Sequence, residues 1–390
     1  MKILLNILVN LARFVVASTL LFSGIVKVLD PMGMSIKLAA YLTHWGIALP
    51  PDTAVLPIAA ILLGTMEFAL GVWLTLGMRR RLTTLTILLL MVGLTALTTY
   101  VYLYNPVPDC GCFGEAITLS NGQTLTKNIL LLLLAVLLCW QRQRLFRLIS
   151  EHNQWLTSSW CIIFCIILGT YSWQRLPIVD FTPYRPGTSI PEAMQGEFDV
   201  VDGQSVTLKE PSIPSFALFD ADGNDATDQV LSDSVAYIVA MPFIQKANSG
   251  TSDRLNTLYD YCQDHHLGFY AVISEDLPAY ESWRDRTGST YPVLFSDAET
   301  LEAMVRSNPG LIMLRQGRII RKWHYENIPT EEQLPTLSAL QPEDRSQTYI
   351  RLAMLFFIPL VLVIVLDRLW ALFRLMRVAR RKRKKEVATK

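Results

Sequence analysis

The sequence predicts a polytopic α-helical membrane bundle that carries an α/β domain outside the membrane. Of its 390 residues, 51% are hydrophobic and only 18% are charged, against roughly 25% charged in a typical soluble domain. The apolar residues are gathered in blocks, and a membrane span needs ~20 of them. One long and more polar segment separates the last two blocks, and strand and helix patterns alternate along it, which is typical of an α/β layer structure.

Six apolar blocks are candidate membrane spans. They lie at about 4–28, 54–77, 82–104, 128–140, 155–173 and 350–366. The fourth is continuous only over 129–140, so we expect it to recruit its flanking residues. Arg13 interrupts the first block, which continues well beyond it. We therefore expect an uncleaved first span rather than a signal peptide.

Clusters of positive charge define the expected orientation. They follow the second, fourth and sixth blocks, at 79–81, 142–147 and 374–385, whereas the loop at 105–126 has no Lys or Arg. With the N-terminus inside, all three clusters lie in the cytoplasm, as the positive-inside rule requires. We expect a bacterial inner-membrane protein with six spans, cytoplasmic termini and a periplasmic segment at 177–347. The basic tail directly follows an apolar helix, so it indicates the lipid bilayer as partner and no nucleic acid.

The expected domain boundaries follow from these blocks. A four-span membrane domain comes first, and a Pro-rich stretch reads as a linker before the exported domain. The segments are 1–148 for the four-span domain, 149–176 for the fifth span, 177–206 for the linker, 207–347 for the exported domain, 348–373 for the sixth span and 374–390 for the basic cytoplasmic tail.

The exported domain shows alternating strand and helix patterns that end in a hairpin around Gln316-Gly317. The strand patterns occupy 215–220, 236–241, 269–273, 291–295, 311–315 and 318–323, and the helix patterns occupy 252–266, 278–286 and 300–306. An acidic run, Asp220 to Asp225, invites a calcium interpretation. It lacks the distal Glu of a calcium-binding loop, which favours a turn at Asp222-Gly223.

The order of elements over 207–330 resembles an exported, membrane-tethered thioredoxin-like domain of the TlpA type. The most specific match is Asn308-Pro309 followed by a strand, a turn and a strand. The resemblance implies that Pro309 is the cis-proline beside the client-binding groove. It also implies a redox Cys pair after the strand at 236–241, but 242–247 contains no Cys. Cys262, in a helix pattern, fits core packing. The domain is therefore expected to be degenerate.

The first 140 residues carry a second resemblance. The run at 22–27 with Asp30-Pro31, followed by Glu67 and Gly71 in the second block, resembles the DoxX family of four-span proteins. The run at 109–114, which contains Cys110 and Cys112, is similar to the motif of MauE. The MauE resemblance implies a role in disulfide formation of exported protein beside a thioredoxin-like companion. The DoxX resemblance implies a possible quinone as the only cofactor.

Cys110 and Cys112 are the candidate catalytic residues, and three interpretations stay open. In the expected topology their loop lies outside, where disulfides persist. A disulfide across one residue closes a very small ring, so it should be easily reduced, as an exchanging pair requires. A structural clip is the second interpretation. A metal site is the third, although two thiolates alone leave a zinc site incomplete and the loop has no His.

Three ionisable groups in the spans are candidate supporting residues, because a charge in hydrocarbon is costly unless it is paired. Counted from the block ends, Arg13 and Glu67 lie ~14–15 Å from the same membrane face, so we expect them to pair. A structural ion pair and a proton or quinone role both stay open. Lys27 lies at the outer end of its span, where it would lower a cysteine pKa or extend to the headgroups.

Three functions follow from these features. The first is a membrane thiol–disulfide redox protein that exchanges electrons through Cys110 and Cys112 and presents an exported or membrane protein client on the thioredoxin-like domain. The second is a non-catalytic assembly subunit whose thioredoxin-like domain binds a partner. The third is a quinone-linked oxidoreductase subunit. A transporter is disfavoured because the sequence shows no internal repeat.

Overall fold

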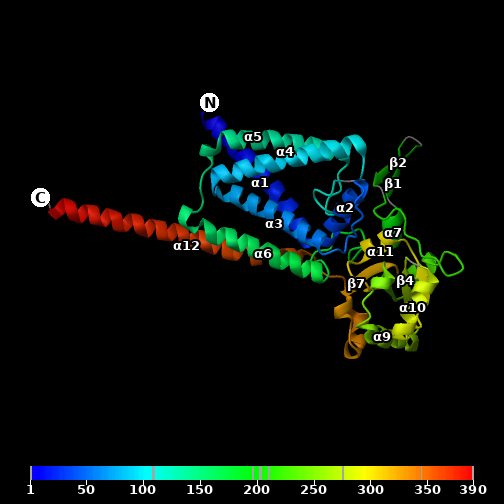
Figure 1. The fold of residues 1–390 in the computed structure, drawn as a ribbon. Helices are drawn as coiled ribbons and strands as arrows, with labels where there is room; N and C mark the ends of the chain where they lie inside the picture. Colours follow the sequence, from blue (N-terminus) through cyan, green and yellow to red (C-terminus); the bar gives the residue numbers. More distant parts are fainter. Residues whose placement is uncertain are drawn as a thin grey trace. The chain divides into compact units, whose positions relative to one another are not determined.

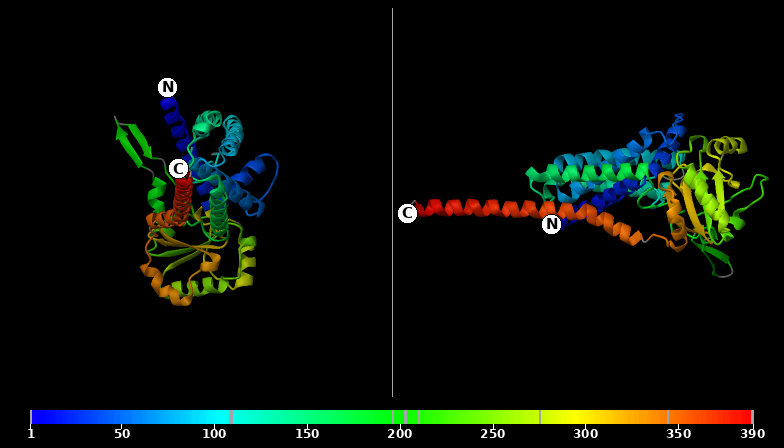
Figure 2. Two further views of the ribbon diagram at one scale, coloured as in Figure 1. Left: turned by 90° about the vertical axis from the view of Figure 1, so that its left-hand side faces the viewer. Right: turned by 90° about the horizontal axis from the view of Figure 1, so that it is seen from below.

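The computed structural model describes residues 2–388 except 108, 109, 196, 202, 203, 210, 275 and 344. Asp109 of the cysteine motif and the end of the expected basic tail lie outside the described residues. The chain folds into two compact units (Figures 1 and 2). A helical unit comprises Met1–Trp173 and Ser346–Lys390, and an α/β unit comprises Gln174–Arg345.

Six described helices of the helical unit are long and apolar enough to cross a membrane, which makes the chain a membrane protein. Each of them covers one predicted apolar block. The fourth does recruit its flank, because Ser120 and Gln123 form a capping box that starts the helix well before the block. The six are α1 (Lys2–Leu29), α3 (Val55–Leu76), α4 (Arg80–Tyr104), α5 (Asn121–Trp140), α6 (Gln154–Gln174) and α12 (Arg345–Ala388).

Helices α1 and α3 approach each other closely at two glycines. A Cβ on Gly24 would lie 2.4 Å from the Phe68 amide nitrogen and 2.6 Å from the Gly64 carbonyl oxygen. A Cβ on Gly64 would lie 2.8 Å from the Gly24 carbonyl oxygen. Small residues of this kind let helix backbones meet without an intervening side chain. The contact brings polar groups on α1 within direct reach of those on α3.

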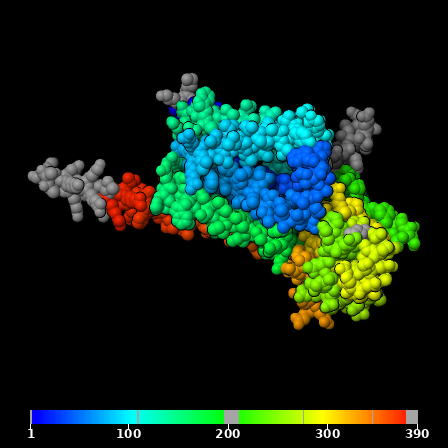
Figure 3. Space-filling view, in the orientation of Figure 1, coloured from blue at the N-terminus to red at the C-terminus, as the bar shows by residue number. Residues whose placement is uncertain are grey.

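A helix that the apolar blocks did not predict, α2 (Pro31–His44), follows α1 directly. Asp30 caps it by accepting a hydrogen bond from the Gly33 amide, and Pro31 begins the first turn, where its missing N–H costs nothing. It packs against α3, and the two lie in the middle of the face of the helical unit that Figure 3 shows, in blue. It places Tyr41 next to the cysteine loop.

Asp367 of α12 ties that helix to the segment between α5 and α6. Its carboxylate accepts hydrogen bonds from the Ser150 amide, 2.9 Å away, and from the Asn153 side chain, 2.7 Å away. These donors lie at the start of η2 (Glu151–Asn153) and α6, so Asp367 supplies an N-terminal cap from another helix.

The α/β unit contains a five-stranded mixed sheet in the order β5-β4-β3-β6-β7. Strands β3, β4 and β5 are parallel, and β6 and β7 form an antiparallel hairpin around Gln316 and Gly317. The arrangement is consistent with a thioredoxin-like fold. The strands are β3 (Ala236–Met241), β4 (Gly268–Ile273), β5 (Val293–Phe295), β6 (Gly310–Arg315) and β7 (Arg318–His324), and a separate hairpin pairs β1 (Glu197–Val201) with β2 (Gln204–Lys209).

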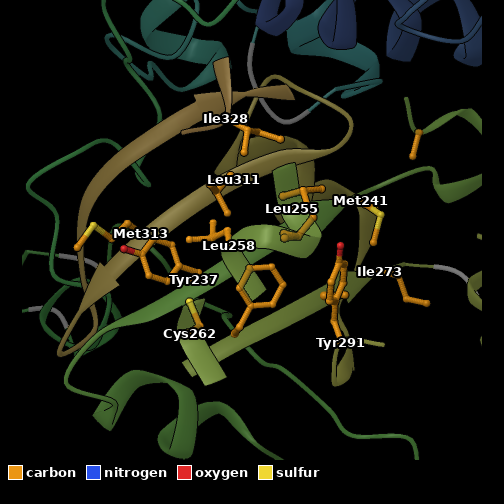
Figure 4. Close-up of a cluster of buried hydrophobic side chains, with 14 of the residues drawn as sticks. Tyr237, Met241, Leu255, Leu258, Cys262, Ile273, Tyr291, Leu311, Met313 and Ile328 are labelled. Atoms are coloured by element: carbon orange, nitrogen blue, oxygen red, sulfur yellow. The ribbon is translucent and has the colours of Figure 1, made fainter. Parts of the chain in front are cut away.

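Helices cover both faces of this sheet because its central strand is apolar on both sides. Tyr237 and Met241 face one core, and Ile238 and Ala240 face the other. Cys262 is fully buried in the first core, as predicted (Figure 4). The helical elements are α7 (Ile190–Gln195), α8 (Thr227–Ser232), η3 (Ile244–Lys246), α9 (Ser252–Asp264), α10 (Leu277–Thr287), α11 (Ala298–Met304), η4 (Tyr325–Asn327) and η5 (Glu331–Ala339).

Two local expectations for this unit differ from the structure. The segment 215–220 is not a strand, and only isolated bridges join Phe219 to Asp225 and Phe295. The segment 177–206, expected as an extended linker, contains α7 and buries Ile190 in the second core. The expected turn after Asp220 is present, because its carboxylate accepts hydrogen bonds from the amides of Asp222 and Asn224.

The close helix contact predicts a difference between two glycine substitutions. Gly24→Ala should destabilise the helical unit by about 1–3 kcal/mol, because the added methyl group overlaps the backbone of α3. Gly93→Ala on α4 is the matched control, since a Cβ there meets no atom within 4 Å. Unfolding of the purified protein in mixed micelles measures both changes. Equal stability of the two variants would contradict the packing argument.

Candidate functional site

Cys110 and Cys112 lie in the loop between α4 and α5 as free thiols with their sulfur atoms 2.7 Å apart. Gly111 between them has φ +68, and a Cβ there would lie 2.5 Å from Lys37 Cδ. The positive φ favours glycine, whereas the Lys37 side chain is flexible and could move away from a Cβ. The sulfurs lie within about 1 Å of a disulfide bond length, so loss of two electrons and two protons would join them with little movement.

A buried ion pair between Lys27 and Glu67 holds the carbonyl end of this loop. Lys27 Nζ lies 2.8 Å from Glu67 Oε2, and the two side chains are 3% and 2% exposed. The ammonium also donates to the Cys112 carbonyl oxygen at 2.8 Å. Ser23 Oγ lies 2.7 Å from both Glu67 Oε2 and the Cys112 carbonyl oxygen. Two side chains of α1 and one of α3 therefore fix the backbone beside Cys112.

The position of Lys27 follows from the direction of helical side chains. A Cα–Cβ bond tilts toward the helix N-terminus, so the Lys27 ammonium lies back at the level of Ser23, 2.7 Å from its Oγ. Buried there, Lys27 does not extend to the headgroups.

The prediction that Arg13 pairs with Glu67 is wrong. Arg13 Nε donates to the Leu74 carbonyl oxygen at 2.8 Å, and its Nη2 donates to the Thr75 carbonyl oxygen. These carbonyls belong to the last turn of α3, where intrahelical partners are missing and the helix dipole is negative. The depths were counted from the ends of the blocks, but α1 and α3 pack with their ends offset, which puts Arg13 beside the end of α3.

Lys127 and Tyr41 are site residues that sequence reasoning missed. Lys127 Nζ lies 4.0 Å from the ring centre of Phe113, next to Cys112. The Tyr41 hydroxyl lies 3.4 Å from the Cys110 carbonyl oxygen. Lys127 is the first cation after a loop without Lys or Arg, a signal that could have marked it. Nothing in the sequence indicates Tyr41, since its helix was not predicted.

The surroundings make the two thiols unequal. A hydrogen bond from the Cys110 thiol lowers the pKa of Cys112 to about 7, and Lys127 and Lys27 act in the same direction against the effect of burial. The same hydrogen bond, with burial, raises the pKa of Cys110. Near neutral pH, a large fraction of Cys112 is therefore thiolate, whereas Cys110 stays protonated and donates to it, the asymmetry that thiol–disulfide exchange uses.

Both cysteines line a cavity of about 280 Å³ inside the helical unit. Lys27, Glu67 and Lys127 also line it, so its polar groups gather around the thiols. Its volume is close to the lower end of the roughly 300–1,000 Å³ typical of ligand pockets, which are mainly apolar with a few placed polar groups. The apolar walls include Leu20, Met34, Leu38, Trp45, Leu63, Met91, Leu94, Phe113 and Leu131.

Pro309 is the predicted site residue of the α/β unit. The Asn308–Pro309 peptide bond is cis, as the thioredoxin-like resemblance implies. Asn308 Nδ2 donates to the Phe243 carbonyl oxygen at 2.7 Å, so the proline loop contacts the segment where that family carries its Cys pair. The segment 242–247 has no Cys, and Cys262 is fully buried elsewhere in the unit. Among the described residues, no three His, Cys, Asp or Glu side chains gather as metal ligands.

The buried pair predicts a strongly non-additive set of variants. Glu67→Gln should destabilise the helical unit by about 3–5 kcal/mol, because it leaves a buried Lys27 uncompensated. Lys27→Met combined with Glu67→Leu should recover most of that loss. Unfolding in mixed micelles measures the free energies. Arg13→Met is the control, and its effect should add to that of Glu67→Gln. A non-additive Arg13 result, or no recovery in the double variant, would contradict the assigned partners.

The unequal thiols predict a pH profile for Cys112. In the reduced protein, alkylation of Cys112 by iodoacetamide, followed by peptide mass spectrometry, should rise as pH increases through about 7, because the thiolate is the reactive form. Lys127→Met should move the midpoint to higher pH by removing a nearby cation. Lys246→Met, in the α/β unit, should leave it unchanged. A midpoint near the ordinary thiol value in the unmodified protein would contradict the assigned electrostatics.

Comparisons with known proteins find a family model and a solved structure that are similar to parts of the chain. Residues 5–141 match the family model described as "Methylamine utilisation protein MauE". No curated protein matches the chain. Among solved structures, the chain is similar to the solution structure of a candidate protein disulfide isomerase from Bacteroides thetaiotaomicron, at 18% identity and a TM-score of 0.26 over 32% of this chain and 82% of that one. The part of the chain that carries the cysteine loop and the ion pair is therefore similar to the MauE membrane family.

Proposed function

We propose that the chain is a membrane thiol–disulfide redox protein that exchanges electrons through Cys110 and Cys112. The single observation that carries this proposal is the contact of the two sulfur atoms, 2.7 Å apart, beside the cations Lys27 and Lys127. A structural clip would not need an apolar cavity at the thiols. Similarity of residues 5–141 to MauE supports a disulfide-related role in a membrane.

In the proposed reaction the Cys110–Cys112 disulfide oxidises a client dithiol. A client thiolate attacks one sulfur of the pair and forms a mixed disulfide, and the other cysteine leaves as a thiolate. The second client thiolate then displaces the first sulfur. The client gains a disulfide, and the pair gains two electrons and, with its protons, becomes a dithiol. Stabilisation of the Cys112 thiolate favours this reduced state, which makes the pair oxidising.

The cavity favours a quinone-linked role as a second candidate function. The reduced pair must pass two electrons to an acceptor before it can act again, and both thiols line an apolar space within a membrane unit. A lipid-soluble quinone would take the two electrons and two protons, leaving a disulfide and a quinol. Lys127 lines the same space, and its ammonium would donate a hydrogen bond to an oxygen of the quinone.

The α/β unit would bind the exported or membrane protein client and leave the chemistry to the helical unit. Its one cysteine, Cys262, is fully buried, so dithiol exchange passes through Cys110 and Cys112. An extended client segment would add as a strand beside Pro309. The proposal includes a bacterial inner-membrane location with six spans, cytoplasmic termini and a periplasmic α/β unit, and kinship with DoxX and TlpA-type proteins.

Replacing both cysteines tests the proposal. The Cys110→Ala/Cys112→Ala protein should lose oxidation of a dithiol peptide by more than a hundredfold, while folding and client binding persist. Cys139→Ala, on α5, is the matched control and should retain exchange. Pro309→Ala should weaken client binding without changing the redox potential of the pair. The same peptide-oxidation assay is then run without oxygen. A water-soluble quinone added as electron acceptor should restore repeated turnover only in protein that has both cysteines.

Two outcomes would contradict the proposal. If the double alanine protein retains full exchange, the redox role is wrong, and a non-catalytic assembly subunit that binds a partner through its α/β unit replaces it. If the double alanine protein loses exchange, but no quinone restores turnover of the unmodified protein, the quinone-linked candidate fails while the dithiol role stands.

A further inference from the structure

Five arginines line a hollow of about 460 Å³ at the end of the helical unit where α3 gives way to α4 and α5 ends. Arg79, Arg80 and Arg81 come from the α3–α4 turn, and Arg142 and Arg147 come from the segment after α5. The 25 residues of α4 separate this end from the cysteine loop by ~37 Å at 1.5 Å per residue. The cluster therefore stands apart from the redox site.

The positive charge of this cluster is largely uncompensated. Among the described residues, only Glu151 forms an ion pair with it, through Arg147. The guanidinium groups of Arg81 and Arg142 have no partner in the described part of the chain. Arg80 Nη1 donates to the Gln143 carbonyl oxygen at 3.3 Å, but its Nε is shielded from solvent and has no hydrogen-bond partner.

Helix α4 adds to the attraction for an anion. It begins at Arg80, and no side chain caps its first turn, so its free amides and the positive end of its dipole face the same region. Guanidinium groups bind phosphate oxygens through two parallel hydrogen bonds. These donors together match a phosphate group.

The place of the cluster on the spans indicates where that phosphate comes from. The arginines stand at the ends of helices that are long and apolar enough to cross a membrane, the level at which lipid headgroups lie. Basic pockets between spans on the cytoplasmic side bind anionic headgroups. We propose that this arginine cluster is a binding site for the phosphate of an anionic phospholipid headgroup.

Lipid retention by the full-length protein tests the site. The probes are dioleoyl phosphatidylglycerol, dioleoyl phosphatidylcholine and inorganic phosphate, and native mass spectrometry from detergent counts the bound molecules. The unmodified protein should retain phosphatidylglycerol at least tenfold over phosphatidylcholine. Arg81→Gln/Arg142→Gln should lose that preference, because both groups are free to bind. Arg144→Gln/Arg185→Gln removes the same charge outside the hollow and should keep it.

Three results would overturn the proposal. They are equal retention of the two lipids by the unmodified protein, an unchanged preference in Arg81→Gln/Arg142→Gln, and displacement of phosphatidylglycerol by millimolar inorganic phosphate, which would make the site one for free phosphate. If the double variant does not fold, the lipid preference of the unmodified protein, with and without inorganic phosphate, decides.

Discussion

The buried pair of Lys27 and Glu67 is the interaction on which the helical unit depends. Neither charge is tolerated in an apolar interior without the other, so α1 and α3 must stay in one register. Gly24 and Gly64 allow the helices to come close enough for this contact. The pair then holds the Cys112 carbonyl, which couples the packing of the bundle to the geometry of the two thiols.

This arrangement separates the roles of structure and chemistry. The ammonium of Lys27 is used by Glu67, Ser23 and a backbone carbonyl, and it acts on the Cys112 sulfur only through space. Lys127 supplies a second positive charge from α5. The α/β unit keeps the fold and the cis-proline of its resemblance but has no Cys pair. The proposed redox thiols and the proposed client-binding surface therefore belong to different units of one chain.

The fold was predictable where it depends on a long apolar block or on the residues of a single turn. Block length predicted all six membrane-length helices, and turn residues predicted the hairpin at Gln316 and Gly317. Helix α2 was missed because its 14 residues are too few for a span and follow α1 without a break. The segment 215–220 has the alternation of a strand, yet only Phe219 forms bridges. Whether such a segment pairs along its length depends on its tertiary neighbours, which the local pattern does not reveal.

The site was predictable only in part, because its partners are set by helix register. The cysteine spacing marked the pair, and burial cost marked Glu67 and Arg13 as groups in need of partners. The partners of Glu67 and Arg13 depend on how far α1 and α3 are shifted along their axes relative to each other. The ends of the apolar blocks do not reveal this shift. The partner of Glu67 is therefore Lys27 and not the predicted Arg13. Tyr41 reaches the loop from a helix far from it in sequence.

The central claim is that Cys110 and Cys112 interconvert between dithiol and disulfide in the membrane. Differential alkylation of the thiols in native membranes, followed by mass spectrometry, tests it directly. The account predicts a Cys110–Cys112 disulfide at rest that opens to two alkylated thiols when an external dithiol is added, while Cys161 and Cys165, buried in α6, do not change. A pair that stays reduced, or stays bonded, whatever donor or acceptor is supplied would contradict it.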